Sequence, residues 1–165
     1  MLLQDDPRFA GKAIPIRNLI IVLSFSMLFP ILYFWRKLSK AKSASGGKYP
    51  VWFDNLYLSI FWLDMAGNSF NLYDTYFYFD LIPHFHGTGA LAAVLFGAFS
   101  FSALSAIGTA NIIHMLLEAQ EFYTDVFFKT HNVRGTFDVV NDMTIGIIGT
   151  IAYISFILLY RKFKK

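Results

Sequence analysis

Four apolar segments of this chain are each long enough to cross a lipid bilayer, and they restrict its fold more than any other feature. Crossing the hydrocarbon core takes roughly 20 mostly apolar residues. With 56% hydrophobic and 15% charged residues, the chain also lies outside the composition range of a soluble domain. We therefore expect an all-α fold, a polytopic transmembrane helix bundle of four to five spans that forms a single membrane domain over residues 1–165. The expected spans cover about 18–35, 81–105, 106–128 and 138–160, with a fifth candidate at about 51–67.

The fifth candidate and the first span each leave an alternative. Segment 51–67 is apolar and aromatic but contains Asp54 and Asp64, so it either crosses the bilayer or lies along the interface. We favour a crossing, because re-entrant segments are less common. Basic residues precede the first span as in a signal peptide, yet its long apolar core ends in a Trp-Arg-Lys run at 35–37 without a small-residue cleavage site. We interpret it as a retained anchor.

The distribution of Lys and Arg predicts the orientation. With five spans, nine basic residues lie on the side of the 36–48 loop and the C-terminal tail, against five on the other side. The positive-inside rule then predicts a multi-pass protein of the cell membrane, with its N-terminus outside and its C-terminus in the cytoplasm. Topology and anionic headgroups explain the net charge of +3. We expect membrane lipids, and no nucleic acid, as partners. The sequence leaves open whether the chain forms a homo-oligomer.

The third span opens with polar groups on one helix face. Asp80 and His84 are four residues apart, which places them on the same face. A structural interpretation exists for Asp80, as a helix cap with Pro83 in the first turn. This interpretation does not explain His84, although a single histidine near an interface is more often a structural hydrogen-bonding group than a ligand.

The fourth span carries a stripe of polar side chains along an otherwise apolar helix. At about 100° per residue, its members fall within roughly 80° of arc. The stripe consists of Asn111, His114, Glu118, Glu121 and Asp125. Ionisable groups at membrane depth cost about 2.5 to 3.5 kcal/mol each, so the stripe needs partners or water. A helix end that emerges into the headgroups explains Asp125 better than His114 or Glu118, which lie deeper.

The last span repeats the pattern at its start. Asp138 and Asp142 are again four residues apart, with Arg134 and Asn141 nearby. The helix dipole and an N-cap at Thr136 account for Asp138. They account less well for Asp142, which lies a turn deeper.

The predicted topology brings these three polar helix ends to one membrane face. Six carboxylates there face two permanent cations, Lys129 and Arg134, so salt bridges cannot neutralise them all. The remainder must be protonated, bind a cation or contact water. We predict catalytic residues at Asp80, His84, Glu118, Glu121, Asp138 and Asp142, substrate-binding residues at Arg134, Asn141, His114 and Asp125, and metal ligands at His84, Glu118, Glu121 and Asp142. The cofactor is undetermined, but these ligand types suit a divalent cation such as Mg²⁺, Mn²⁺ or Zn²⁺.

Small residues recur every four positions in the third span, at Gly89, Ala93 and Gly97. This small-xxx-small pattern lets membrane helices approach closely. By the helical angle per residue, it lies roughly opposite the face of Asp80 and His84. We expect the third helix to pack tightly on one side and to display its polar groups on the other.

The polar positions resemble those of the VanZ-like and YjdF-like families of small bacterial membrane proteins. In the VanZ-like pattern an Asp-x-x-x-His opens one helix, an acidic pair or Glu-x-x-Gln ends the next, and Arg, Asp and Asn/Asp lead into a Gly. The matching residues are Asp80 and His84, Glu118 and Glu121, then Arg134, Asp138, Asp142 and Gly146. The segments 62–68 and 72–74 look more like the YjdF-type branch. The resemblance covers about residues 50–150 and implies an architecture rather than an activity.

Three functions stay open on the sequence. The first is an enzyme acting on a lipid or lipid-linked headgroup at the outer face, with metal binding or proton transfer at the polar site. The second is a non-catalytic membrane protein whose polar cluster sets helix packing or binds a partner. The third is a small proton-coupled transporter that uses the stripe as a relay. Phosphate-binding glycine loops and the motifs of soluble hydrolases are absent from the sequence.

The topology predicts which loops face the cell exterior. Because the chain has no cysteine, single cysteines at Ser43, Thr130 and Lys164 would each report their own position. With a membrane-impermeant maleimide on intact cells, Thr130→Cys should be labelled, whereas Ser43→Cys and Lys164→Cys should react only after permeabilisation. Labelling of Thr130→Cys and Ser43→Cys from the same side would contradict the five-span topology.

Overall fold

The described part of the chain is all-helical, as the composition predicts. The computed structural model describes residues 52–130 and 133–163, together with scattered positions between 19 and 37. The helices are α2 (Trp52–Ser69), α3 (Leu72–Thr75), α4 (Leu81–Gly97), α5 (Ala103–Phe128) and α6 (Thr136–Phe163). Of the first predicted span, residues 22–28 are helical and most of the rest lies outside the described residues. Phe25 of this segment packs edge-on against Trp62 of α2.

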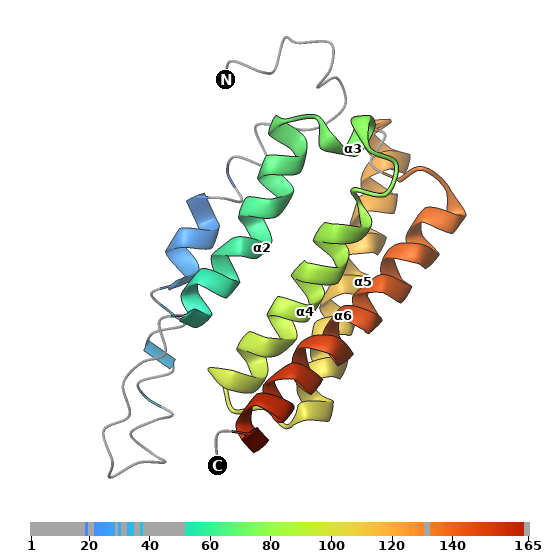
Figure 1. Ribbon diagram of the computed structural model, residues 1–165. Coiled ribbons are helices and arrows are strands. Elements are labelled where there is room, and N and C mark those ends of the chain that lie inside the picture. The colour runs from blue at the N-terminus through green and yellow to red at the C-terminus, as the bar shows by residue number, and fades with distance from the viewer. Residues whose placement is uncertain are drawn as a thin grey trace.

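Four long helices lie side by side, and α4 contacts the other three (Figure 1). Helix α4 runs parallel to α6, because His84 lies near Asp142 and Gly89 lies near Gly149. Helices α2 and α5 run antiparallel to this pair. The end of α2, the short helix α3, the start of α4, the end of α5 and the start of α6 therefore lie at one end of the bundle (Figure 1).

The turn between α4 and α5 lies earlier than the sequence pattern predicts. The apolar run suggested one span to residue 105 and the next from 106, but α4 ends at Gly97 and α5 begins at Ala103. The physical reason is an N-cap: the Ser102 hydroxyl accepts a hydrogen bond from the Ser105 backbone N–H at 3.1 Å. Ser100 adopts a left-handed conformation, with φ of 61°, and so interrupts the helix.

Glycines allow the backbones of α4 and α6 to approach closely. A methyl group on Gly89 would lie 2.5 Å from the Tyr153 ring and 2.9 Å from the Gly149 carbonyl oxygen, and one on Gly149 would overlap the Phe85 carbonyl. The predicted packing role of the small residues in α4 is confirmed for Gly89 and for Gly97. However, they have different partners, since Gly97 packs against the Phe53 ring of α2.

Small and polar side chains are buried in this bundle, whereas large apolar ones are exposed. The buried residues of α5 are Ala106, Ala110, His114 and Glu118. On the same helix Leu104 is 81% exposed and Leu116 is 60% exposed. An apolar surface this extensive marks a contact with lipid or with another protein.

One described helix has both the length and the composition of a membrane span. It is the segment Phe137–Phe163 of α6, which has 27 residues. This segment is strongly apolar, and most of it is exposed on the surface of the bundle. Helix α4 is also apolar but has only 17 residues. In α2 and α5, aspartate, glutamate, histidine and asparagine side chains interrupt the apolar sequence.

Gly149 tests the close approach of α4 and α6. Gly149→Ala should destabilise the protein by about 1–3 kcal/mol, because the new methyl group meets the rigid Phe85 backbone. Gly108 in α5 is the matched control, since a Cβ there has nothing within 4 Å. Gly108→Ala should leave stability unchanged or raise it by up to about 1 kcal/mol. Thermal unfolding of the detergent-solubilised protein measures both, and equal effects would contradict the proposed contact.

Candidate metal centre

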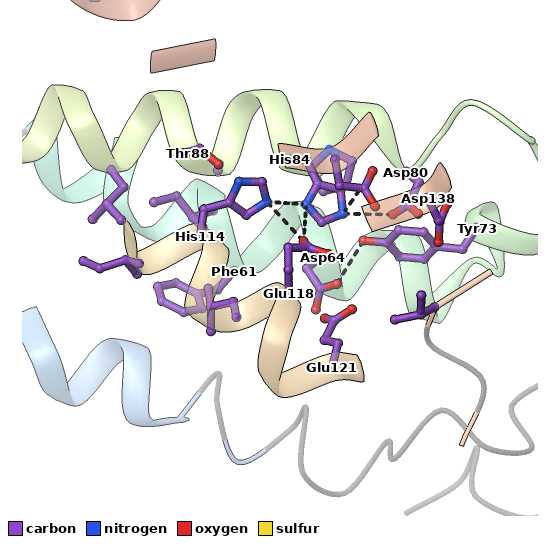
Figure 2. A pocket seen from close by; sticks show the side chains of 18 of the residues that line it. Phe61, Asp64, Tyr73, Asp80, His84, Thr88, His114, Glu118, Glu121 and Asp138 are labelled. Atoms are coloured by element: carbon purple, nitrogen blue, oxygen red, sulfur yellow. Dashed lines mark hydrogen bonds and ion pairs between the residues drawn. The ribbon is translucent and has the colours of Figure 1, made fainter. Parts of the chain in front are cut away.

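A cavity of about 370 Å³ lies between α2, α4 and α5 and reaches the start of α6 (Figure 2). This volume lies within the range of ligand-binding pockets. The half of the cavity toward the middle of the bundle is apolar, with Ile60, Phe61, Leu91, Ile113 and Leu117 in its wall. The half toward the start of α4 is lined mainly by charged side chains. The cavity therefore has the polarity of an amphiphile.

Three potential metal-donor atoms from α4 and α5 meet where the two halves join. His84 Nδ1 lies 2.9 Å from His114 Nε2 and 3.2 Å from Glu118 Oε1. His114 Nε2 is in turn 3.1 Å from Glu118 Oε1. His114 and Glu118, one helical turn apart on α5, are buried, with 7% and 4% exposure. These three residues form a donor triangle, and we keep this name for them.

At most two of the three contacts in the donor triangle can be hydrogen bonds. A hydrogen bond joins an atom that carries a proton to one that does not. Whichever of the three atoms carry protons, at least two of them are alike. At least one of the three contacts therefore joins two donors or two acceptors. A cation that accepts all three lone pairs removes this conflict.

The dimensions of the donor triangle fit such a cation. Ligand atoms about 2.1 Å from an octahedral ion and 90° apart lie about 3.0 Å from each other. The observed separations of 2.9, 3.1 and 3.2 Å match this arrangement. Two imidazoles and one carboxylate on one face of an ion leave its other positions open, as in the facial triads of divalent iron sites.

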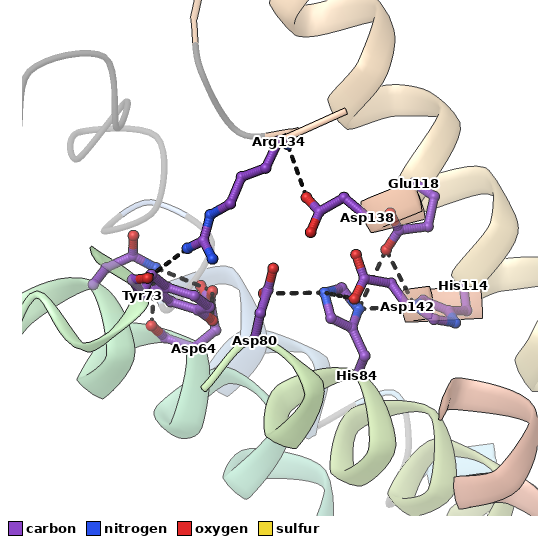
Figure 3. A network of polar contacts seen from close by, with 10 residues as sticks. Asp64, Tyr73, Asp80, His84, His114, Glu118, Arg134, Asp138 and Asp142 are labelled. Atoms are coloured by element: carbon purple, nitrogen blue, oxygen red, sulfur yellow. Dashed lines mark hydrogen bonds and ion pairs between the residues drawn. The ribbon is translucent and has the colours of Figure 1, made fainter. Parts of the chain in front are cut away.

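His84 also faces two carboxylates through its other nitrogen (Figure 3). Its Nε2 lies 3.3 Å from Asp80 Oδ1 and 3.8 Å from Asp142 Oδ1. A metal-bound histidine commonly donates its second N–H to a carboxylate, which fixes the ring orientation. Asp80 occupies that position if an ion binds Nδ1. These three residues are also close enough to form an alternative donor set, with ligand atoms within 4.8 Å of one another.

Asp142 carries a polar atom without a hydrogen bond. Its side chain lines the cavity, the residue is only 3% exposed, and Oδ1 accepts no hydrogen bond from the described residues. Burying an unsatisfied carboxylate oxygen is costly. A ligand, a cation or a water molecule in the cavity would relieve that cost, so Asp142 points to an occupant.

The structure brings most of the predicted site residues to this cavity. Its wall contains all six predicted catalytic residues, and also His114 and Arg134. Two of the predicted substrate-binding residues do not line it: Asn141 is exposed on α6, and Asp125 accepts a hydrogen bond from the loop that follows α5. Two of the four predicted substrate-binding residues, His114 and Arg134, therefore reach the cavity.

The four polar residues of the α5 stripe other than Glu118 have different contacts from one another. Glu121 lines the cavity but belongs to neither described donor set, whereas His114, predicted to bind substrate, belongs to the donor triangle. Asp125 Oδ2 accepts a hydrogen bond from the Val133 backbone N–H at 2.8 Å. Asn111 donates to Thr150 Oγ1 at 3.0 Å and so joins α5 to α6.

The two predicted helix caps have different outcomes. Asp80 occupies the N-cap position of α4, but its side chain makes no capping hydrogen bond and lies beside His84 instead. Its backbone is helical, with φ of −54° and ψ of −37°, and so lacks the extended conformation of a capping residue. For α6, the side chain of the predicted cap Thr136 lies outside the described residues. Asp138 lies in the first turn, and its Oδ2 accepts a hydrogen bond from the Arg134 backbone N–H at 2.8 Å, which ties the preceding loop to the helix.

Helix α2 contributes a carboxylate that the sequence interpretation did not assign to the site. Asp64 lines the cavity, and its Oδ1 accepts hydrogen bonds from Tyr73 Oη at 2.9 Å and Asn68 Nδ2 at 3.1 Å. Gly67 leaves room for the Tyr73 and Phe79 rings. In the sequence, the feature that could have assigned Asp64 to the site was an aspartate within an apolar segment, followed four residues later by Asn68.

A second histidine, His86, joins three helices without entering the donor triangle. Ser59 Oγ donates to the Leu56 carbonyl at 2.7 Å, so its lone pair accepts the proton of His86 Nε2, also at 2.7 Å. His86 Nδ1 then accepts the hydroxyl proton of Tyr153 at 2.7 Å. Every polar atom in this chain of contacts has a partner, which indicates a structural role between α2, α4 and α6.

No family model matches the chain, and neither a curated protein nor a solved structure matches it. The resemblance to the VanZ-like and YjdF-like families therefore stays a prediction.

The His86 contacts predict a loss of stability that is separate from the metal centre. Tyr153→Phe leaves His86 Nδ1 without its donor and should destabilise the protein by about 1–3 kcal/mol. Tyr123→Phe is the matched control, because Tyr123 is 57% exposed and makes ring contacts with Phe122 and Phe127. Unfolding in detergent, followed by circular dichroism, measures both. A Tyr153→Phe protein as stable as the control would show that the contacts are not structural.

Proposed function

We propose that this chain is a multi-pass membrane enzyme that binds one divalent metal ion at His84, His114 and Glu118 and acts on a lipid or lipid-linked headgroup. The observation that carries the proposal is the donor triangle, in which at most two of the three mutual contacts can be hydrogen bonds. The buried, unsatisfied oxygen of Asp142 in the same cavity supports it independently.

The surface of the bundle supports a position in the membrane. Large apolar side chains are exposed, whereas the carboxylates and histidines of α4, α5 and α6 are buried or half-buried, which is the arrangement expected of a bundle surrounded by lipid. Exposed aromatic residues also gather at the end of the bundle where the charged half of the cavity lies. They are Phe70, Phe77, Tyr78, Phe127, Phe128 and Phe137, each more than 70% exposed. Aromatic side chains at one level suit a membrane interface.

The neighbouring groups supply what hydrolysis or group transfer at a headgroup requires. A divalent ion at the donor triangle would act as a Lewis acid toward a carbonyl or phosphoryl oxygen. Asp142, whose Oδ1 lies 3.8 Å from His84 Nε2 and which lines the same cavity, would accept a proton from a nucleophile there. Asp80 orients the imidazole of His84 through Nε2. With an ion bound, Glu118 and Asp142 balance its two positive charges within the buried part of the site.

Metal analysis of the purified full-length protein tests this function. After incubation with Mn²⁺, Fe²⁺ or Zn²⁺ and removal of free ion, the protein should retain about one ion per chain, because three protein ligands suffice for a catalytic site. Glu118→Gln and His114→Gln should each reduce retention of that ion by at least about tenfold, since each removes one ligand. Inductively coupled plasma mass spectrometry gives the stoichiometry.

The second histidine of α4 provides the control. His86→Gln removes an imidazole two positions from His84, but that imidazole bonds to Ser59 and Tyr153 rather than to the donor triangle. The folded His86→Gln protein should retain the ion. A wild-type protein that holds no ion, or an equal loss in His86→Gln and Glu118→Gln, would exclude the proposed metal centre and favour a structural polar cluster.

A further inference from the structure

One nitrogen of His84 faces two carboxylates but carries at most one proton (Figure 3). This nitrogen, Nε2, lies 3.3 Å from Asp80 Oδ1 and 3.8 Å from Asp142 Oδ1. Its N–H can donate to Asp80, which is the nearer of the two. Asp142 Oδ1 is then too far away for a hydrogen bond. A single proton therefore does not serve both carboxylates, whereas a cation between the three atoms would contact all of them.

Asp142 gives an independent indication that a ligand binds here. The residue is 3% exposed, and its Oδ1 has no hydrogen-bond partner among the described residues. The side chain lines the cavity together with Asp80 and His84, and it points toward the His84 ring (Figure 3). Burying a carboxylate oxygen without a partner is costly. A cation bound to this oxygen would remove that cost.

The spacing of the three donor atoms is close to that of a tetrahedral metal site. Ligand atoms about 2.1 Å from a tetrahedral zinc ion lie about 3.4 Å from one another. The 3.3 Å between His84 Nε2 and Asp80 Oδ1 matches this separation. The 3.8 Å to Asp142 Oδ1 is about 0.4 Å longer, a difference that rotation of the carboxylate would close. All three donor atoms lie within 4.8 Å of one another.

The charges around His84 balance when two divalent ions are bound. Three carboxylates contact its ring, those of Asp80, Glu118 and Asp142. One ion at the donor triangle leaves one negative charge in excess among these groups. A second ion displaces the proton of Nε2 to the solvent, so the ring becomes an imidazolate with one negative charge. Four positive charges then face four negative ones, as a buried site requires.

We infer that Asp80, His84 and Asp142 bind a second divalent ion, so that the His84 ring bridges two ions through Nδ1 and Nε2. The inference deepens the proposed function and rests on it for the first ion, at His114 and Glu118. Imidazole and carboxylate ligands of this kind suit Zn²⁺ and Cu²⁺.

The second ion gives the site a further means of activating a nucleophile. Asp80, His84 and Asp142 all line the cavity, so the remaining position of this ion is open to it. A divalent ion with an open position binds water and makes it a nucleophile near neutral pH. Asp142 then acts on the nucleophile through the ion that it holds, while the ion of the donor triangle binds an oxygen of the headgroup.

Equilibrium binding of Zn²⁺ counts the ions. The full-length protein in dodecyl maltoside is dialysed against a chelator buffer that fixes the concentration of free Zn²⁺, and bound metal is measured. The wild type should bind two ions per chain at saturation. The second ion should bind more weakly, because it displaces a proton and is repelled by the first ion, so removal of free ion leaves one. Saturation at one ion per chain would overturn the inference.

Two aspartates one turn apart on α6 provide matched variants. Asp142→Asn removes the charge of one ligand and leaves the donor triangle intact, so this variant should bind one ion instead of two. The ion that it keeps shows that it is folded. Asp138→Asn changes a cavity-lining carboxylate of neither described donor set, and its oxygen can still accept the Arg134 backbone N–H. It should bind two ions. Equal numbers in the two variants would overturn the inference.

Copper tests whether the two ions share one imidazole. Cu²⁺ binds nitrogen and oxygen ligands more tightly than the neighbouring divalent metals. Two Cu²⁺ ions joined by an imidazolate are antiferromagnetically coupled, so the electron paramagnetic resonance signal of the wild type should weaken on cooling. Asp142→Asn, with one Cu²⁺, should give the full signal of one isolated spin. Two copper ions per chain with independent spins would overturn the inference.

The two metal sites can fail separately. Glu118→Gln changes the donor triangle, whereas Asp142→Asn changes the second site. A single ion that is lost in Glu118→Gln and kept in Asp142→Asn would keep the proposed function and overturn this inference. A single ion with the opposite behaviour would overturn both, because no ion would then lie at the donor triangle. A protein that binds no ion would also overturn both.

Discussion

The backbones of α4 and α6 touch because glycines remove the side chains that would separate them. Gly89 lies against Gly149 and Tyr153, and Gly149 lies against the Phe85 carbonyl. This parallel contact sets the height of the two helix starts relative to each other, and it thereby brings His84 beside Asp142. Gly146, one turn before Gly149, leaves the space that the His114 ring occupies. The position of the site therefore depends on glycine contacts between α4 and α6, and no charged group takes part in these contacts.

The distribution of polarity in the bundle follows from that packing. Close helix contacts need small residues, so alanines and glycines occupy the interfaces, and the larger apolar side chains point outward. The same interior contains His114, Glu118 and Asp142, which are costly to bury unless they have partners. Some polar groups are satisfied within the protein, as Ser59, His86 and Tyr153 satisfy one another, and they show what a structural polar network looks like here. The donor triangle differs from this network, because at most two of its three contacts can be hydrogen bonds.

Helical periodicity was sufficient to predict much of the site. The spacing of His114 and Glu118 placed them on one face of α5, and the topology placed that face near the starts of α4 and α6, where the structure has it. Periodicity could not distinguish Glu118 from Glu121 as a ligand, because both lie on the predicted stripe. Their difference depends on the rotation of α5 against α4, which directs Glu118 to His84 and Glu121 to the cavity wall. The role of Asp80 was also ambiguous, because a residue at this position can either cap the helix or pair with His84 four residues later. The helical backbone at Asp80 and the absence of a capping hydrogen bond favour the pairing with His84.

The sequence by itself determined that the chain is helical, because long apolar segments and the 3.6-residue spacing of polar groups are local properties. It also determined which helix ends carry carboxylates and histidines. The tertiary structure decided which of these groups touch, since contact between residues as far apart as His84 and His114 depends on the height and rotation of packed helices. It also decided that Asp64 of α2 completes the charged wall of the cavity, a role that depends on Tyr73 and Asn68 holding the carboxylate in place. A local pattern can specify a face of a helix, but only packing specifies what that face meets.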